Sequence, residues 1–97
     1  MIVERDVFQA KYGHGDELVA LLKESKPMMI KAGAKNVRIL TDLTGTFFTV
    51  VMEVEYGSAA EMEKTLSMMG DPEFEKWFQR MVPMVDTGNR QLFSIVD

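Results

Sequence analysis

The sequence predicts an α+β domain whose elements follow the order β-α-β-β-α-β. Three observations carry this prediction: strand-like and helix-like apolar spacings alternate along the chain, one corner sequence occurs twice, and the chain holds 97 residues. Independent domains typically contain ~100–150 residues, so residues 1–97 are expected to form a single domain. A chain this short buries little surface, and association with a partner would add to its stability.

The first third of the chain is predicted to form a strand and then a helix. Apolar spacing indicates a strand over residues 3–10. Asp16 is expected to cap the helix that follows, and Gly33 to close it in a left-handed turn. Because Pro27 lies inside this helix and lacks a backbone donor, we expect a kink or a short break near Ser25.

A hairpin and a second helix follow. β-branched and aromatic residues predict strands over 37–41 and 46–56, with a turn between them. Ser58 and Glu61 have the spacing of a capping box, so the second helix is expected to begin there. The helix is predicted to stop at Gly70.

The chain is then predicted to restart a helix and to end in a strand. Asp71 and Pro72 are residue types favoured at the cap and in the first turn of a helix. The apolar face of this helix is expected to reach Val85. Residues 87–89 are predicted to form a connection, and residues 90–96 the last strand.

A shift of the chain by 44 positions aligns its two halves. The residues that coincide are Val7, Tyr12, Gly13, Glu17 and Leu22 with Val51, Tyr56, Gly57, Glu61 and Leu66. Two β-α-β units in tandem form the split β-α-β, or ferredoxin-like, arrangement. The predicted fold is therefore a four-stranded antiparallel sheet with two helices on one face.

The face of the sheet opposite the helices is expected to carry both apolar and polar side chains. Alternation along the strands assigns to it Val3, Arg5, Val7, Gln9, Phe47, Thr49, Val51, Glu53 and Glu55. Such a face is too apolar for water and too polar for a dry core, so we expect a lined cavity closed by a second subunit. The alternate residues of the third strand form an apolar row expected to face the helices: Phe48, Val50, Met52, Val54 and Tyr56. The same alternation would turn Glu4 and Asp6 toward the helices, which predicts a register slip or a bulge near the start of the first strand.

Composition and charge exclude several classes of protein. The chain has no cysteine, so it can form neither a disulfide nor a thiolate metal site. Residues 1–52 have a charge balance of +1 and residues 53–97 a balance of -5, and the acidic second half would repel the phosphates of a nucleic acid. No stretch approaches the ~20 apolar residues of a membrane span, and the charged first residues differ from a secretory signal. We therefore expect a cytoplasmic protein without nucleic-acid or membrane partners.

Two corner sequences are similar to motifs of a known superfamily. Residues Lys11-Tyr12-Gly13-His14-Gly15-Asp16-Glu17-Leu18 are similar to its "K-x-G-x-x-x-E-h" pattern before the first helix. Residues Gly88-Asn89-Arg90-Gln91-Leu92 are similar to its "G-x-R-x-h" pattern before the last strand. The whole chain resembles the dimeric α/β-barrel superfamily, and within it the small NIPSNAP-like proteins.

The resemblance implies two ferredoxin-like subunits whose sheets pack face to face as a homodimer. The superfamily includes cofactor-free monooxygenases that act on polyketide-like aromatics, chlorite-dismutase-type haem proteins, muconolactone-isomerase-like enzymes and members without a known activity. A shared fold does not select one of these functions.

Two residues are candidates for moving a proton. His14 is the only histidine and lies between two glycines, where a ligand could approach; an exposed loop histidine is the simpler interpretation. Glu53 is the second candidate, on the strand of the open face. We expect no metal site, because transition metals prefer imidazole or thiolate ligands. The chain has a single histidine and no cysteine. No cofactor is expected.

Four further residues are candidates for ligand binding. Arg38, Thr49 and Arg90 are strand residues that could project into the barrel, where an arginine can hold a carboxylate or enolate oxygen. An intersubunit salt bridge would explain the arginines equally well. Trp77 belongs to an aromatic and thioether cluster, for which core packing is the alternative explanation. The other members of this cluster are Met68, Met69, Phe74, Phe78, Met81 and Met84.

Two functions remain open from the sequence. In the first, a homodimeric, cofactor-free domain binds a small apolar or aromatic molecule with one anionic or carbonyl oxygen in its barrel. If that domain is an enzyme, oxygenation or isomerisation is the expected chemistry. In the second, the chain is a non-catalytic dimeric structural or interaction module whose barrel is filled by side chains.

Overall fold

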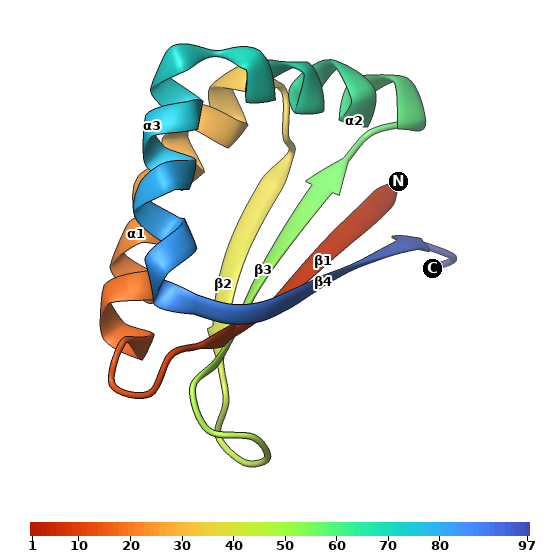
Figure 1. Cartoon of the computed structure of the whole chain (residues 1–97). Helices are drawn as coiled ribbons and strands as arrows, with labels where there is room; N and C mark the ends of the chain where they lie inside the picture. Colours follow the sequence, from red (N-terminus) through yellow and green to blue (C-terminus); the bar gives the residue numbers. More distant parts are fainter.

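The computed structural model covers residues 1–97 and describes all of them except the side chains of Met68 and Met69. It confirms the predicted α+β architecture, a four-stranded antiparallel sheet with the helices on one face (Figure 1). The elements, in chain order, are β1 (Ile2–Ala10), α1 (Gly15–Ala32), β2 (Asn36–Thr41), β3 (Thr49–Tyr56), α2 (Ala59–Leu66), α3 (Pro72–Met81) and β4 (Val85–Ser94). Short 3₁₀ turns at Ser67–Gly70 and Val82–Met84 follow α2 and α3. The second helix is thus divided into two pieces, as the break at Gly70 predicts.

The order of strands in the sheet is β2-β3-β1-β4, so the two strands of the predicted repeat, β1 and β3, lie in the centre. Every neighbouring pair is antiparallel. Residues from both ends of the chain meet on adjacent strands, because Ile2 pairs with Ser94 (Figure 1).

The predicted slip near the start of β1 is wrong. From Ile2 to Gln9, β1 keeps one register against β3, and a shift against β4 occurs only at the far end, between Gln9 and Ala10. Glu4 and Asp6 therefore do turn toward the helices, where 2% and 7% of their surfaces remain exposed. The ladder tolerates these carboxyl groups because Arg90 on β4 lies directly opposite Asp6 and faces them.

Two strands begin three or more residues away from their predicted starts, and the other strand boundaries lie within two residues of the prediction. β3 begins at Thr49, not at residue 46, because Phe48 adopts a left-handed backbone conformation with φ of 59°, which belongs to a turn and not to a strand. β4 begins at Val85, not at residue 90, because pairing with β1 already starts between Ala10 and Val85. Residues 87–89, predicted to be a connection, therefore belong to the sheet.

Helix α1 differs from the prediction at two points. It is unbroken across Pro27, since this proline removes a single bond, the one to the carbonyl of Lys23, on an exposed part of the helix. Asp16 is not the cap: His14 occupies that position without a side-chain bond, and Asp16 lies in the first turn, where its charge complements the helix dipole. Gly33 closes the helix with φ of 125°, as predicted.

The predicted caps of α2 and α3 are confirmed. The backbone N–H of Glu61 donates to the Ser58 hydroxyl at 3.2 Å, and the Glu61 carboxylate accepts from the backbone of Gly57 at 2.9 Å. The Asp71 carboxylate accepts from the backbone N–H of Glu73 at 2.9 Å. These bonds satisfy backbone N–H groups at the start of each of the two short helices.

The hydrophobic core lies between the helices and the sheet. Its buried members include Leu18, Leu21, Leu22, Met29, Val37, Val50, Met52, Val54, Tyr56, Trp77 and Met81. Three of the residues that β3 was predicted to send toward the helices, Val50, Val54 and Tyr56, are at most 1% exposed. The core is most open toward β4, where the cavity described below begins.

Candidate functional site

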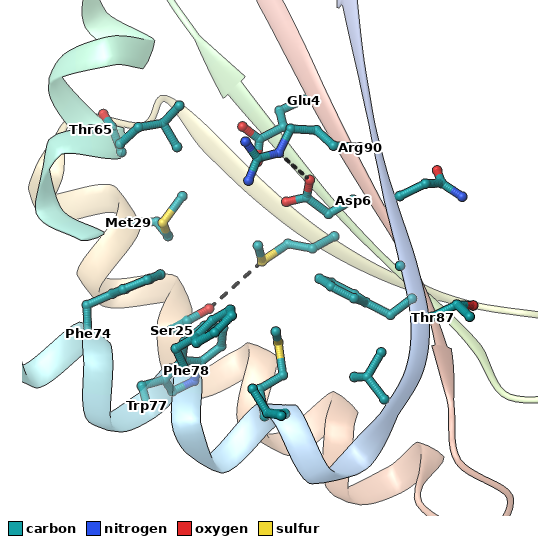
Figure 2. A pocket seen from close by; sticks show the side chains of 18 of the residues that line it. Glu4, Asp6, Ser25, Met29, Thr65, Phe74, Trp77, Phe78, Thr87 and Arg90 are labelled. Atoms are coloured by element: carbon teal, nitrogen blue, oxygen red, sulfur yellow. Dashed lines mark hydrogen bonds and ion pairs between the residues drawn. The ribbon is translucent and has the colours of Figure 1, made fainter. Parts of the chain in front are cut away.

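A cavity of about 530 Å³ lies between the sheet and the helix layer, lined by residues of β1, β3, β4, α1, α2 and α3. Figure 2 shows its side chains converging from these elements. The apolar lining includes Phe8, Met29, Met52, Leu66, Phe74, Trp77, Phe78, Met81, Val82 and Val85. This volume falls in the range of ~300–1,000 Å³ that is usual for small-molecule sites.

One wall of the cavity is aromatic and belongs to α3. The indole Nε1 of Trp77 donates to the backbone carbonyl of Leu21 at 2.7 Å, which fixes the ring against α1. The Phe74 ring lies with its centroid 5.3 Å from that of Trp77. Opposite them, the Met52 sulfur is 3.9 Å from the Ser25 hydroxyl. The wall is thus largely apolar, and the bond from Trp77 to Leu21 anchors it to α1 outside the cavity.

The other end of the cavity carries a charged cluster. Arg90 Nε lies 3.4 Å from Asp6 Oδ1 and 4.0 Å from Glu4 Oε2, so two carboxyl groups approach one guanidinium nitrogen (Figure 2). Glu4 Oε1 is buried and has no hydrogen-bond partner, and neither does the buried hydroxyl of Tyr56. Two carboxyl groups and one arginine leave this cluster with an excess of acceptors.

The protonation of Glu4 follows from this arrangement. Burial, as the largest cause, and the neighbouring Asp6 carboxyl group together raise the pKa of Glu4 to about 8, and only Arg90 opposes them. Burial, together with the charges of Glu4 and Asp6, also raises the pKa of Tyr56. At neutral pH the cluster therefore contains a carboxylic acid, which can donate a hydrogen bond.

A second charged cluster lies on the opposite, helix-free face of the sheet. Arg5 Nε donates to Glu53 Oε2 at 2.7 Å, and Arg38 donates to Glu53 Oε1. Burial alone would raise the pKa of Glu53, but the hydrogen bonds and charges of Arg38 and Arg5 outweigh it, and the pKa is lowered. Glu53 is thus held as a carboxylate, a state unsuited to proton donation.

The structure separates the residues singled out by the sequence. Arg90 and Trp77 both line the cavity, which places Arg90 on the helix side and not on the open face where the sequence put it. Arg38 and Glu53 meet on the open face. Thr49 also lies there, where its hydroxyl donates to Gln9 Oε1 at 3.2 Å.

His14 lies apart from both clusters. Its Nδ1 is 3.6 Å from Glu17 Oε2, one turn into α1, and it is not among the residues that line the cavity. Phe74, Phe78 and Met81 of the predicted aromatic and thioether cluster do line the cavity, and Met84 packs beside the core. The side chains of Met68 and Met69 lie outside the described part of the chain.

The sequence did not lead us to Glu4 and Asp6, the two carboxyl groups that line the cavity beside Arg90. Glu4 and Asp6 stand at alternate positions of β1, on the face that carries Phe8 and Ala10. Charged residues at inward positions of a central strand were interpreted as a register error, whereas the structure brings them together with Arg90 at the cavity. The sequence feature that could have identified them is the pair of inward carboxyl groups on β1 together with Arg90 on β4.

Within the described residues, no group of three or more His, Cys, Asp or Glu side chains is arranged to hold a metal ion. The same part of the chain contains no helix with the length and apolar character needed to cross a membrane.

The chain was compared with known proteins in sequence and in structure, and only the solved structures match it. No family model matches the chain, and no curated protein matches it in sequence. Solved structures do match along nearly the whole chain. An uncharacterised NIPSNAP domain protein from Burkholderia xenovorans has a TM-score of 0.84 at 18% identity, with 99% of this chain and 95% of the other covered.

Two further structures come from proteins described as oxygenases. SnoaB, a cofactor-independent oxygenase from Streptomyces nogalater, has a TM-score of 0.81 at 12% identity, with 99% and 93% of the two chains covered. A proposed antibiotic biosynthesis monooxygenase from Nitrosomonas europaea has a TM-score of 0.82 at 10% identity, with both chains covered fully. At these identities the similarity shows the fold: the chain is a ferredoxin-like protein of the architecture seen in NIPSNAP domain proteins and in this group of oxygenases.

Proposed function

We propose that the protein binds a small, largely apolar or aromatic molecule with one carbonyl oxygen in the cavity between its helices and its sheet. One observation carries this proposal: an apolar cavity of about 530 Å³ ends in a polar cluster formed by Glu4, Asp6 and Arg90. Apolar pockets with a few convergent polar groups are typical of small-molecule sites. The site differs from the expected one, because it lies on the helix side of the sheet.

Oxygenation or isomerisation of the bound molecule is the chemistry that we propose, without a cofactor. The likeness in fold to a cofactor-independent oxygenase supports this proposal by analogy. The competing function is a non-catalytic dimeric module whose barrel, between the two open sheet faces, is filled by side chains. The pairing of Glu53 with Arg5 and Arg38 on the open face supports this alternative.

Native mass spectrometry of the purified protein tests binding directly. We expect a co-purified small molecule, or a complex with added 2-tetralone, a neutral bicyclic aromatic ketone. Val82→Trp should weaken this complex at least about tenfold, because Val82 lines the cavity and a larger side chain would fill it. Val96→Trp is the matched control, at an exposed position near the C-terminus. Equal binding by both variants, or none by the wild type, would contradict the proposed site.

We also propose a homodimer that packs the helix-free faces of two sheets together. Val7 and Val51 pair directly across β1 and β3 on this face, and Leu40 and Phe93 are exposed at neighbouring positions. A second copy would cover these apolar side chains without any disulfide. The cytoplasmic location expected from the sequence is part of this proposal, and cell fractionation tests it.

Sedimentation velocity tests the dimer. The wild type should sediment at twice the 11.0 kDa chain mass. Val51→Lys should give a monomer, because an ammonium group at the centre of a desolvated face would lack a partner. Val96→Lys should remain a dimer, and a monomeric wild type would contradict the face-to-face arrangement.

A further inference from the structure

We infer that Glu4 and Asp6 form a proton-relay pair that interconverts the keto and enol forms of a neutral ketone held in the cavity. The inference rests on the proposed function, because it requires a ketone in that cavity. It goes further by assigning the reaction, the two catalytic residues and the charge of the substrate.

The geometry places both carboxyl groups at one end of an apolar space. Both line the cavity, both approach the same nitrogen of Arg90, and Glu4 keeps only 2% of its surface exposed (Figure 2). Glu4 Oε1 has no hydrogen-bond partner. A buried carboxyl oxygen without a partner is costly, and a ligand oxygen that accepts the Glu4 proton would relieve that cost.

The groups around Glu4 favour its neutral form. Asp6 on β1, Tyr56 on β3 and Arg90 on β4 act on it, and Asp86 on β4 also lines the cavity. The helices α1, α2 and α3 contribute only apolar, hydroxyl and indole groups to the described lining. Burial raises the pKa of Glu4 to about 8, so that Arg90 balances the charge of Asp6 while Glu4 stays protonated.

This charge balance selects the substrate. The Glu4 acid, the Asp6 carboxylate and the Arg90 guanidinium have no net charge, and Asp86 adds a negative charge to the lining. A ligand carboxylate would therefore bring an uncompensated charge into the cavity. A neutral carbonyl oxygen instead accepts a hydrogen bond from the Glu4 acid. The structure therefore favours a neutral aromatic or alicyclic ketone.

The proposed step balances without an oxidant. The Asp6 carboxylate takes a proton from the carbon next to the carbonyl, so that a C–H bond breaks and a C=C bond forms. At the same time Glu4 gives its proton to the carbonyl oxygen, and the C=O bond becomes C–OH. The new proton on Asp6 then passes to the Glu4 carboxylate, which approaches the same Arg90 nitrogen, and this restores the starting state.

Exchange of the α-hydrogens of 2-tetralone for deuterium, followed by NMR in D₂O, tests the relay. Binding is measured separately through the fluorescence of Trp77, the single tryptophan of the chain. We expect faster exchange than in buffer, and Glu4→Gln or Asp6→Asn should each lower it about 100-fold or more while 2-tetralone still binds. Glu63→Gln, an exposed change on α2, should leave the rate unchanged.

Two further readouts test the role of Glu4 as the acid and the preference of the cavity for a neutral ligand. A merely structural role of Glu4 would not give the first of them. The value of kcat/KM should fall above pH of about 8 as Glu4 loses its proton, and 2-tetralone itself does not titrate there. 2-Naphthoate, which has the same ring system with a carboxylate, should bind at least about tenfold more weakly than 2-tetralone.

The outcomes separate the two proposals. If 2-tetralone binds but does not exchange faster than in buffer, the relay is wrong and the binding function stands. If nothing binds, both are wrong. Exchange by Glu4→Gln at the wild-type rate would overturn the assignment of the acid. Should that variant fail to fold, a flat pH profile of the wild type above pH 8 would overturn it instead.

Discussion

Two buried glutamates on adjacent strands of the same sheet have opposite chemistry. Glu4 on β1 faces the helices, and Glu53 on β3 faces away from them, with 2% and 4% of their surfaces exposed. The pKa of Glu4 is raised to about 8, whereas the pKa of Glu53 is lowered. Solvent exposure is nearly equal, but Glu4 is more deeply desolvated than Glu53, and at Glu53 the two arginines outweigh the effect of burial.

The charges around Glu4 and Glu53 also differ, in the ratio of arginines to carboxyl groups. Two guanidiniums, from Arg5 and Arg38, bind the single carboxylate of Glu53. On the other face, one guanidinium serves both Glu4 and Asp6. The open face therefore holds a fixed ion cluster suited to assembly, and the cavity face holds an exchangeable proton suited to chemistry.

The dependence of stability on pH should show the largest effect. The folded state keeps the proton on Glu4 up to pH about 8, whereas the unfolded chain loses it near its ordinary value of 4.5. As the pH rises from 4.5 to about 8, the free energy of unfolding should therefore decrease, by at most about 1.4 kcal/mol per pH unit. Glu4→Gln should remove this slope in urea titrations, and Glu63→Gln should keep it. An unchanged slope in Glu4→Gln would contradict the raised pKa.

Loss of one arginine from the open face should show a smaller effect. Arg38→Met should lower the free energy of unfolding by about 1 kcal/mol at pH 7, because the buried Glu53 carboxylate loses one of its two partners. The loss should shrink as the pH falls below 4.5, since Glu53 becomes protonated and its stabilising charge pairs disappear.

Arg80 provides a matched control for that variant. Its side chain is 58% exposed, like that of Arg38, but its partner Glu24 is 52% exposed, whereas Glu53 is only 4% exposed. Arg80→Met should therefore cost at most about 0.5 kcal/mol. Equal losses in the two variants, measured by urea denaturation, would show that the burial of the carboxylate does not matter.

The smallest expected effect concerns the edge of the same ion cluster. The guanidinium carbon of Arg5 lies 5.2 Å from the centre of the Phe93 ring. A double-mutant cycle of Phe93→Leu and Arg5→Met should give a coupling of about 0.5 kcal/mol, as expected for a partly exposed cation–π contact. Additive losses in thermal denaturation would show that the ring does not help to position Arg5.

The sequence was sufficient for the order of elements, the 44-residue repeat and the caps at Ser58 and Asp71, since local patterns determine these features. It was also sufficient to place Arg38 and Glu53 on the same open face, because strand alternation has a strict period of two, but their ion pair emerged only from the structure. It failed at 46–48 and at 85–89, where the turn conformation and pairing with β1 override local propensity.

Only the tertiary structure decided where the chemistry lies. Strand alternation turned Glu4 and Asp6 toward the helices, but the expectation drawn from it was a register slip. Local patterns also could not show that the helices leave about 530 Å³ of apolar space beside these residues. Nor could they place Arg90 against both carboxyl groups, because that contact joins residues more than 80 positions apart through the register of β1 and β4. A pKa depends on every charge and on all the solvent around a group, and these are arranged only when the strands and helices pack together.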